Sequence, residues 1–292
     1  MTAISPNLPA DLLPTQLRMG AVRLRVRDAA RSIAFYRDTI GLELIGPEGA
    51  ISRLGVGTDV LIELEAAPDA GPRPRGATGL FHVAILLPSR VALAVVLRRL
   101  VAQGVRLGAS DHLVSEALYM DDPDGNGIEI YRDRRPGEWN WDGPVVEMAT
   151  KHLDLRALLA DAPDSVPLSE PMPVGTVVGH VHLQVGEIAA ARRFYVEHLG
   201  FDVTTDRYPG ALFVSAGRYH HHLGLNVWQS RGGNAPPAGS VGLVHYEVVV
   251  PDTAALDVVR ARMSQAGVAV ADIPGGLALA DPWGTRVHFR AA

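Results

Sequence analysis

Three blocks of this 292-residue sequence occur twice, in the same order and at nearly the same spacing. The repeated pairs of segments are 22–26 (VRLRV) with 181–185 (VHLQV), 79–88 (GLFHVAILLP) with 242–251 (GLVHYEVVVP), and 122–131 (DPDGNGIEIY) with 281–290 (DPWGTRVHFR). The offset is 159 residues for the first and last pairs and 163 for the middle pair. Three matches in one order indicate an internal duplication, which restricts the chain to a fold built from repeated units.

Each unit has the pattern of a strand, a helix and three further strands. In the first unit, Val22, Leu24 and Val26 alternate with polar residues as in a half-buried strand. Asp28 can cap the helix that follows, and Gly41 can end it. We therefore expect an α+β fold of four βαβββ modules paired into two domains. The expected boundaries are an N-terminal domain at 18–133 (modules 18–67 and 79–133), a linker at 134–176, and a C-terminal domain at 177–292 (modules 177–229 and 241–290).

Composition restricts the partners of the protein. The net charge is −5 and no basic block exists, so we expect no nucleic-acid partner. The N-terminal segment lacks the charged and apolar parts of a signal peptide, and no apolar run is long enough to span a bilayer. We therefore expect a soluble cytoplasmic protein without membrane contact. The sequence leaves open whether it forms a homo-oligomer.

Histidines are the main candidates for chemistry. The chain has no cysteine, so any metal must be bound by histidine and carboxylate side chains. His82 and His180 lie in first strands of modules, and His220, His221 and His222 precede another apolar strand. Glu129 lies between Ile128 and Ile130, so it points to the opposite face of its strand from them. His182 is close to His180, and we expect it to face solvent.

Two short segments carry a resemblance to a known family. Phe35-Tyr36 with Ile40-Gly41-Leu42, and their repeat at 194–201, are similar to the helix signature of the vicinal oxygen chelate superfamily. That superfamily includes glyoxalases, bleomycin-resistance proteins and extradiol dioxygenases. The segments at 112–131 and 215–226 resemble two-domain catechol 2,3-dioxygenase-like proteins. The resemblance implies curved mixed sheets in which two modules enclose one metal ion.

The resemblance also implies a ligand set. In the ring-cleaving members, two histidines and one glutamate from first and last strands bind Fe(II). The first-strand positions here are Ala21, His82, His180 and His245, and last-strand positions include Glu129 and His288. Modules 2 and 3 together supply His82, His180 and Glu129, which is the family triad. Modules 3 and 4 would supply His180, His245 and His288, and this all-histidine set is the alternative.

The catalytic residues implied by the resemblance are His221, Tyr119 and His112. His221 matches the acid/base histidine best, with His220 and His222 as alternatives, and Tyr119 precedes Glu129 by ten residues. The expected activity is extradiol cleavage of a catechol with O2, using Fe(II) or Mn(II) and no organic cofactor. Two alternatives remain: a glyoxalase-like metal-dependent isomerase or lyase, and a metal-free protein that sequesters a small drug-like molecule.

Overall fold

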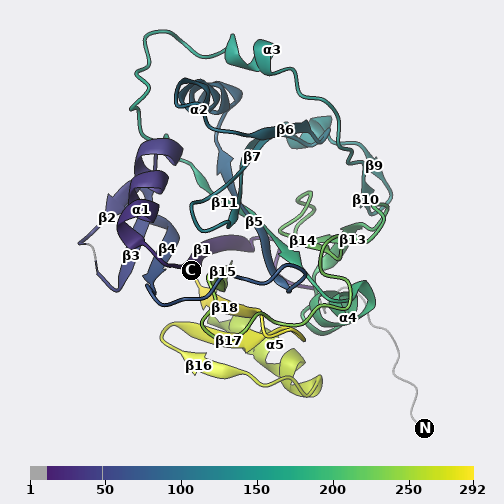
Figure 1. The fold of residues 1–292 in the computed structure, drawn as a ribbon. Helices are drawn as coiled ribbons and strands as arrows, with labels where there is room; N and C mark the ends of the chain where they lie inside the picture. Colours follow the sequence, from purple (N-terminus) through teal and green to yellow (C-terminus); the bar gives the residue numbers. More distant parts are fainter. Residues whose placement is uncertain (1–11, 48) are drawn as a thin grey trace.

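Two eight-stranded sheets form the centre of the described part of the chain (Figure 1). The structure is a computed structural model that describes residues 12–47 and 49–292. The sequence-based expectation that the N-terminal segment is not a signal peptide falls largely on residues 1–11, which lie outside this range. Four βαβββ modules are present in the predicted order, and each sheet is mixed, with parallel and antiparallel pairs. The α+β fold predicted from the repeats is therefore confirmed.

The first sheet joins the first and last modules of the chain. Its strand order is β16-β17-β18-β15-β1-β4-β3-β2. The strands are β1 (Arg18–Val26), β2 (Glu43–Ile45), β3 (Ile51–Val56), β4 (Asp59–Ala66), β15 (Gly242–Val250), β16 (Ala271–Ile273), β17 (Gly276–Ala280) and β18 (Arg286–Ala291). At its centre β1 pairs antiparallel with β15. The two strands that form this centre are separated by the whole of modules 2 and 3.

The second sheet joins modules 2 and 3 in the order β12-β13-β14-β11-β5-β8-β7-β6. Its strands are β5 (Gly79–Leu87), β6 (Gly108–Asp111), β7 (Ser115–Asp121), β8 (Gly127–Asp133), β11 (Val177–Gln184), β12 (Asp202–Thr205), β13 (Ala211–Ser215) and β14 (Leu223–Asn226). The central pair, β5 and β11, comes from the two sides of the linker. The alternative pairing of modules 3 and 4 is therefore wrong, since their strands lie in different sheets. The division of the chain into domains 18–133 and 177–292 stays a prediction.

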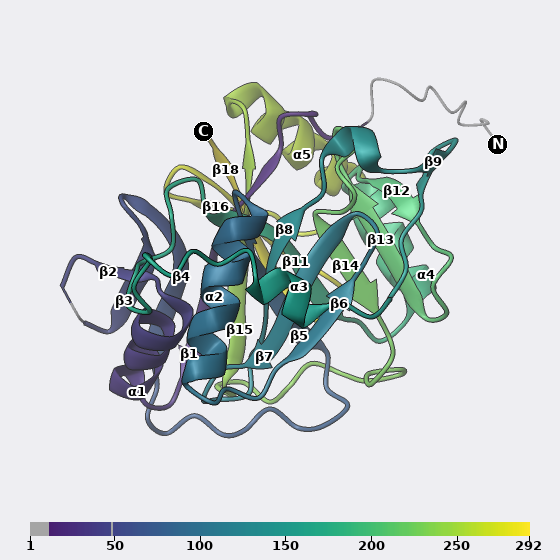
Figure 2. The same ribbon diagram turned by 90° about the horizontal axis from the view of Figure 1, so that it is seen from above.

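Helices cover one face of each sheet (Figure 2). They are α1 (Ala29–Ala34) with its π-helical continuation η1 (Phe35–Ile40), α2 (Arg90–Ala102), α4 (Ile188–Arg192) with η3 (Arg193–His198), and α5 (Thr253–Gln265). Asp28, Ser89 and Asp252 each accept a hydrogen bond from a backbone N–H three residues on, which satisfies one of the free donors of the first turn. The helices bury apolar residues against the sheets, so the opposite sheet faces are left for polar side chains.

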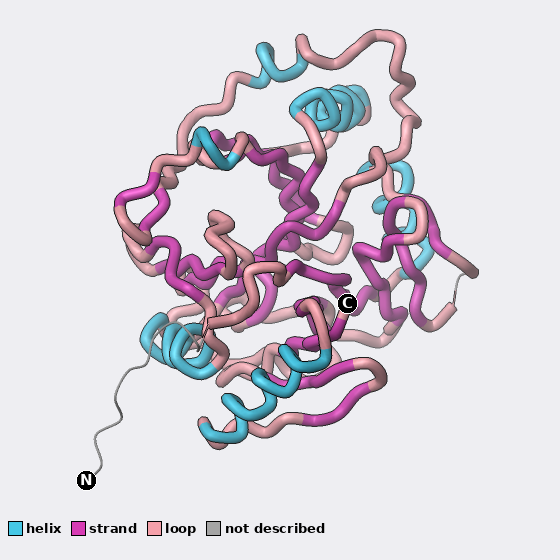
Figure 3. The backbone as a smooth tube through the Cα atoms, turned by 180° about the vertical axis from the view of Figure 1, so that it is seen from behind, coloured by secondary structure: helices cyan, strands magenta, loops and turns pink. Residues whose placement is uncertain are grey.

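The linker runs along modules 2 and 3 (Figure 3). It contains the 3₁₀ turn η2 (Pro136–Glu138), a short hairpin of β9 (Trp141–Asp142) and β10 (Val145–Val146), and α3 (Leu155–Leu159), which packs on α2. The sequence predicted only a linker here, so the hairpin was missed. Two isolated two-residue strands leave almost no periodicity for a sequence to reveal.

A buried arginine attaches the linker to modules 1 and 2. The Arg99 side chain donates hydrogen bonds to the carbonyl oxygens of Ile40 and Leu168 at 2.7 Å, and also to that of Glu170. Gly41 ends the first helix with φ of +98°, and a Cβ there would come within 2.0 Å of the guanidinium. Gly41 therefore serves two purposes: it adopts the left-handed conformation, and it leaves space for Arg99.

Arg99→Met is expected to lower the free energy of unfolding by at least about 3 kcal/mol, because three carbonyl oxygens lose their donor and each costs about 1–3 kcal/mol. Urea unfolding followed by circular dichroism measures this. Arg106→Met is the control, since Arg106 is exposed on the loop after α2. Equal stabilities of the two variants would contradict a structural role for Arg99.

No helix among the described residues is long and apolar enough to cross a membrane.

Candidate active site

Three candidate ligands converge on one face of the second sheet. His82 lies on β5, Glu129 on β8 and His180 on β11, so the residues come from three adjacent strands. Ala84 on β5 is the cross-strand partner of both Glu129 and His180, which brings their side chains to the same place. All three side chains are buried. The pairing of modules 2 and 3 thus brings together the set expected from the sequence.

The distances within this cluster fit a metal site. Oε2 of Glu129 lies 2.9 Å from Nε2 of His82 and 3.1 Å from Nε2 of His180. Three ligand atoms about 2.1 Å from one ion and at right angles to one another would lie about 3.0 Å apart. His82 Nε2 makes no well-directed hydrogen bond to the carboxylate despite the short distance. Among the described residues this nitrogen thus forms no directed hydrogen bond, which leaves it available as a ligand atom.

The electrostatics keep the donors in the forms that bind metals. Burial alone would raise the pKa of Glu129, but His180 and His82 outweigh it and hold the pKa well below its usual range. Burial lowers the pKa of His180 to about 4, although Glu129 opposes the shift. At neutral pH the cluster thus holds a carboxylate and at least one neutral imidazole, which are metal-binding forms.

The fourth position around the cluster is a glycine. Val83 pairs with Ile128 and Val181 pairs with Leu223, so Gly224 on β14 is the counterpart in module 3 of Glu129 in module 2. A Cβ at Gly224 would come within 2.7 Å of the His182 ring, so the glycine gives the imidazole room to lie over the sheet. The cluster therefore has three donors, and its fourth side has the His182 ring over a glycine instead of a second carboxylate.

His182 does not face solvent, contrary to the expectation from sequence. It is 4% exposed, it is the cross-strand partner of His82, and it lines the same cavity. Residues two apart in a strand point to the same face. The spacing of His180 and His182 therefore already predicted that both side chains lie on one face of the sheet. Asn226 accepts a hydrogen bond from the backbone N–H of Trp228 through Oδ1, so its Nδ2 donates to His182 Nε2. The neutral His182 ring therefore carries its hydrogen on Nδ1.

A cavity of about 260 Å³ lies over the cluster. Ligand pockets usually range from about 300 to 1,000 Å³, so this cavity suits a small molecule such as one substituted ring. Aromatic and apolar side chains line most of it, and the linker contributes two residues. The lining includes Phe81, Met148, Thr150, Tyr208, Phe213 and Trp228. None was singled out from the sequence as a substrate contact: Phe81 and Phe213 look like core residues of strands, and the other four lie in loops and turns.

His112 and Tyr119 form a hydrogen-bonded pair at the cavity wall. His112 Nδ1 lies 2.8 Å from the carbonyl oxygen of Ala149, which can only accept, so Nδ1 carries hydrogen. In the neutral ring, Nε2 then accepts from the Tyr119 hydroxyl at 2.7 Å. Burial raises the pKa of Tyr119 well above its usual value, and Glu129 adds to the rise. The hydroxyl is therefore protonated, and its oxygen lone pairs remain available to a bound ligand.

The three consecutive histidines have different surroundings. His221 lines the cavity and its ring centre lies 4.1 Å from that of His180. His222 turns away, and its Nδ1 lies 2.9 Å from Ser215 Oγ. His220 is fully buried and contacts His221 through a 2.8 Å approach of the two Nδ1 atoms. Among the three, His221 is therefore the residue with access to a bound molecule.

The equivalent place in the first sheet has a different composition. His245, Glu247 and His288 lie close enough to share an ion, but their surroundings are cationic. The rings of His245 and His288 stack at 3.8 Å with an interplanar angle of 20°, and Glu247 is paired with Arg290. Ala21 occupies the position that corresponds to His180. Stacked rings cannot direct lone pairs at one ion, so this cluster lacks the arrangement of the second sheet.

Acid is expected to destabilise the protein partly through this stacked pair. Burial, together with the neighbouring histidine for His245 and arginines for both residues, lowers the pKa of His245 to about 3 and that of His288 to about 4. Both are neutral in the folded chain near pH 5, whereas the unfolded chain binds their protons below about pH 6.5. Stability is therefore lost as the pH falls from about 6.5, by up to about 1.4 kcal/mol per pH unit for each histidine.

Urea unfolding of the wild type and of a His245→Gln/His288→Gln variant at pH 7 and pH 5 measures this loss. The variant should lose less stability over the interval. Equal losses in the two proteins would show that the pair does not contribute.

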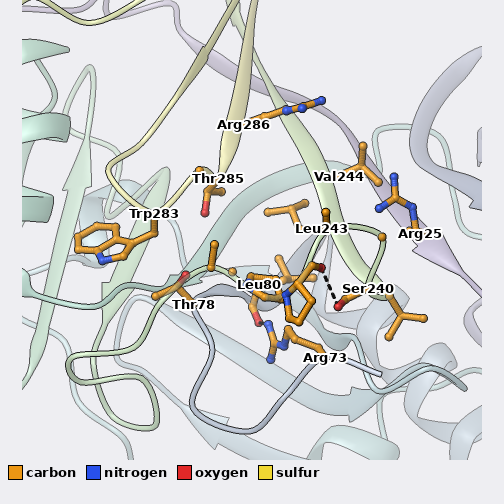
Figure 4. Close-up of a pocket in the computed structure, with 18 residues that line it drawn as sticks. Arg25, Arg73, Thr78, Leu80, Ser240, Leu243, Val244, Trp283, Thr285 and Arg286 are labelled. Atoms are coloured by element: carbon orange, nitrogen blue, oxygen red, sulfur yellow. Dashed lines mark hydrogen bonds between the residues drawn. The ribbon is translucent and has the colours of Figure 1, made fainter. Parts of the chain in front are cut away.

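A second cavity, of about 320 Å³, lies near the ends of the sheets (Figure 4). Arg25, Arg73, Thr78 and Arg286 line it, and Trp283 lies at one side. It contains none of the clustered histidines. The candidate ligands expected from the sequence thus line the cavity of the second sheet and not this one.

Comparison with known proteins places this geometry in a family. The model of the Glyoxalase/Bleomycin resistance protein/Dioxygenase superfamily matches residues 18–130 and 177–289. The chain belongs to this superfamily. Within the superfamily, the catechol-2,3-dioxygenase of Bacillus subtilis (strain 168) is 42% identical over 270 residues, covering 90% of this chain and 93% of that protein. The resemblance stated from the sequence motifs is therefore confirmed.

Solved structures of the superfamily fold are also similar. Glyoxalase I from Zea mays has a TM-score of 0.57 at 17% identity, covering 94% of this chain and 92% of that chain. The cppA protein from Streptococcus pneumoniae TIGR4 has a TM-score of 0.55 at 12% identity, covering 94% and 99%. At these identities the likeness shows the shared fold alone.

Proposed function

We propose that this protein is a metal-dependent extradiol dioxygenase that cleaves the ring of a catechol with O2. The observation that carries the proposal is the donor set: two histidines and one glutamate converge, and Gly224 occupies the fourth position. Three protein ligands on one side leave room for two substrate oxygens and O2. The similarity to the Bacillus subtilis catechol-2,3-dioxygenase supports the same reaction class.

His82, Glu129 and His180 would hold the metal. Two imidazoles and one carboxylate suit Fe(II), and Mn(II) accepts the same donors. When bound, the ion supplies the redox chemistry with O2 and the attraction for the two catechol oxygens. The protein supplies a cavity in which Phe81, Phe213 and Trp228 can pack against a flat ring.

His221 and Tyr119 would handle the protons of the substrate. Burial, followed by the neighbouring His180 and His220, lowers the pKa of His221 well below its usual value. The ring is therefore neutral and can accept a hydroxyl proton of the catechol at a free nitrogen. The Tyr119 oxygen can accept a hydrogen bond from a second hydroxyl, because the Tyr119 hydrogen is directed to His112. The linker holds His112 in place through Ala149.

The two alternative functions have less support. Glyoxalase-like enzymes usually use four ligands with two glutamates, and here Gly224 takes the place of the second one. A metal-free binding protein would need no buried carboxylate between two histidines. Burying Glu129 among these rings costs free energy that a binding cavity would not require.

Anaerobic reconstitution tests the proposal. The protein is loaded separately with Fe(II) and Mn(II), and O2 consumption and ring-opened product are followed with catechol and substituted catechols. We expect about one metal per chain and product formation with at least one catechol. Isomerisation of a hemithioacetal of methylglyoxal without catechol cleavage would support the glyoxalase alternative instead. Tight binding of aromatic compounds without any metal uptake would support the binding-protein alternative.

A further inference from the structure

A chain of hydrogen bonds connects the candidate base to a carboxylate outside the cavity. Asp133 is the last residue of β8, and its side chain is one-fifth exposed. Its Oδ1 lies 2.8 Å from Nε2 of His220, and its Oδ2 accepts from the Tyr219 hydroxyl at 3.0 Å. His220 in turn meets His221 through their Nδ1 atoms, 2.8 Å apart. The sequence indicated none of this, because Asp133 and His220 lie 87 residues apart.

The direction of each hydrogen bond in this chain can be worked out. A carboxylate has no hydrogen to give, so His220 Nε2 donates to Asp133. With a single hydrogen on the ring, His220 then has only a lone pair on Nδ1, and the contact at 2.8 Å requires that His221 Nδ1 donates to it. His221 therefore carries its hydrogen on Nδ1. Its Nε2 has no hydrogen-bond partner among the described residues and retains a lone pair.

The surrounding side chains keep His220 in this orientation. The ring of His220 is fully buried, with Tyr219 at 4.1 Å and Trp139 at 5.2 Å between ring centres. The backbone oxygen of His220 also accepts from Thr204 Oγ1 at 2.6 Å. A ring enclosed on both sides cannot rotate to exchange its nitrogens without opening the core.

We propose that Asp133 and His220 are positioning residues that set the tautomer of His221, so that its Nε2 lone pair is available to take a substrate proton. The structural part of this inference is independent of the reaction, and its kinetic part rests on the proposed dioxygenase function. In the step concerned, a catechol O–H bond breaks and the proton joins Nε2 of His221. The substrate becomes more negative by one charge, His221 gains one positive charge, and no electrons are exchanged.

Replacement of Asp133 by asparagine should reverse the direction of the hydrogen bonds that link residue 133, His220 and His221. The Tyr131 hydroxyl lies 2.7 Å from that of Tyr219, its one hydrogen-bond partner among the described residues, so Tyr131 donates to Tyr219 and Tyr219 donates to residue 133. The amide oxygen therefore stays on the Tyr219 side and the amide nitrogen faces His220. His220 Nε2 must then accept, its Nδ1 carries hydrogen, and His221 Nδ1 becomes the acceptor. The neutral His221 ring would carry its hydrogen on Nε2, where it can no longer take a proton. The shape of the site is unchanged, because asparagine and aspartate have nearly the same size.

The tautomer of His221 can be measured without metal or substrate. Ring ¹⁵N chemical shifts of the metal-free protein, assigned with a His221→Asn variant, should show Nδ1–H in the wild type and Nε2–H in Asp133→Asn. Nε2–H in the wild type, or an unchanged tautomer in Asp133→Asn, would overturn the proposal. These results stand whether or not the protein cleaves a catechol, so they separate this inference from the proposed function.

Kinetics give the second measurement. In the metal-loaded Asp133→Asn variant, kcat should fall by about 10²–10⁴-fold, the usual contribution of a general base, with KM and metal content near those of the wild type. Asp133→Glu restores an acceptor and should recover part of kcat and the wild-type tautomer. A rise in KM with unchanged kcat, or equal loss in the Asn and Glu variants, would contradict a positioning role.

Discussion

Glu129→Gln is expected to remove metal from the protein. Glutamine has the size of glutamate but no charge, and Glu129 is the one carboxylate in the cluster formed with His82 and His180. Loss of a residue that merely supports a ligand costs 10–100-fold in metal affinity, so loss of a direct ligand should cost more than about 100-fold. Metal content after dialysis should therefore fall from about one ion per chain to almost none, and catechol cleavage should fall with it.

His288→Gln is the matched control for this experiment. His288 occupies the place in β18 that Glu129 occupies in β8, but it lies in the stacked pair of the first sheet. Its replacement should leave metal content and activity unchanged. Loss of metal in His288→Gln, with retention in Glu129→Gln, would move the metal site to the first sheet.

His221→Ala should retain the metal and lose turnover. His221 lines the cavity and is not one of the three converging donors, so removing the ring leaves those donors in place. General acid–base groups contribute about 10²–10⁴-fold in rate, and kcat should fall by that factor. Tyr119→Phe should cost much less, because one hydrogen bond contributes about 1 kcal/mol, which is roughly fivefold in rate.

Metal analysis and steady-state kinetics on the same preparations distinguish the outcomes. If His221→Ala loses its metal, His221 is itself a ligand. If its kcat equals that of the wild type, another group takes the proton. His222→Ala provides the comparison, since His222 is bonded to Ser215 and turns away from the cavity. Its turnover should remain within a few-fold of the wild type.

The repeat and the donor chemistry predicted much of this molecule. The nearly constant offset between repeated segments such as 22–26 and 181–185 predicted four modules of the same kind. A duplicated unit must bury its apolar face against another copy. Donor chemistry then favoured modules 2 and 3, the pair that shares the second sheet. The resemblance supplied the candidate ligands and His221, and the structure brings them to one cavity. Their roles stay predictions until metal binding and turnover are measured.

Other parts of the site could not be predicted from the repeat or from the donor chemistry. The contact between Asp133 and His220 depends on the pairing of β5 with β11 and on the loop before β14, and neither residue type specifies a distant partner. Met148 and Thr150 line the cavity although they lie in the linker, where no periodicity indicates orientation. His182 is a different case, because its alternation with His180 predicted the buried face and was misinterpreted.

The arrangement of the two sheets has a consequence for how the chain is made. Modules 2 and 3 are enclosed in the sequence by modules 1 and 4, so the strands of the second sheet are all synthesised before β15 begins at Gly242. β1 ends at Val26 and meets its central partner only when β15 has left the ribosome. At about 5–20 residues per second, synthesis of the roughly 200 intervening residues takes on the order of 10–40 s. During that time module 1 presents an unpaired strand edge that can join other chains, whereas the sheet that carries the cavity can already close.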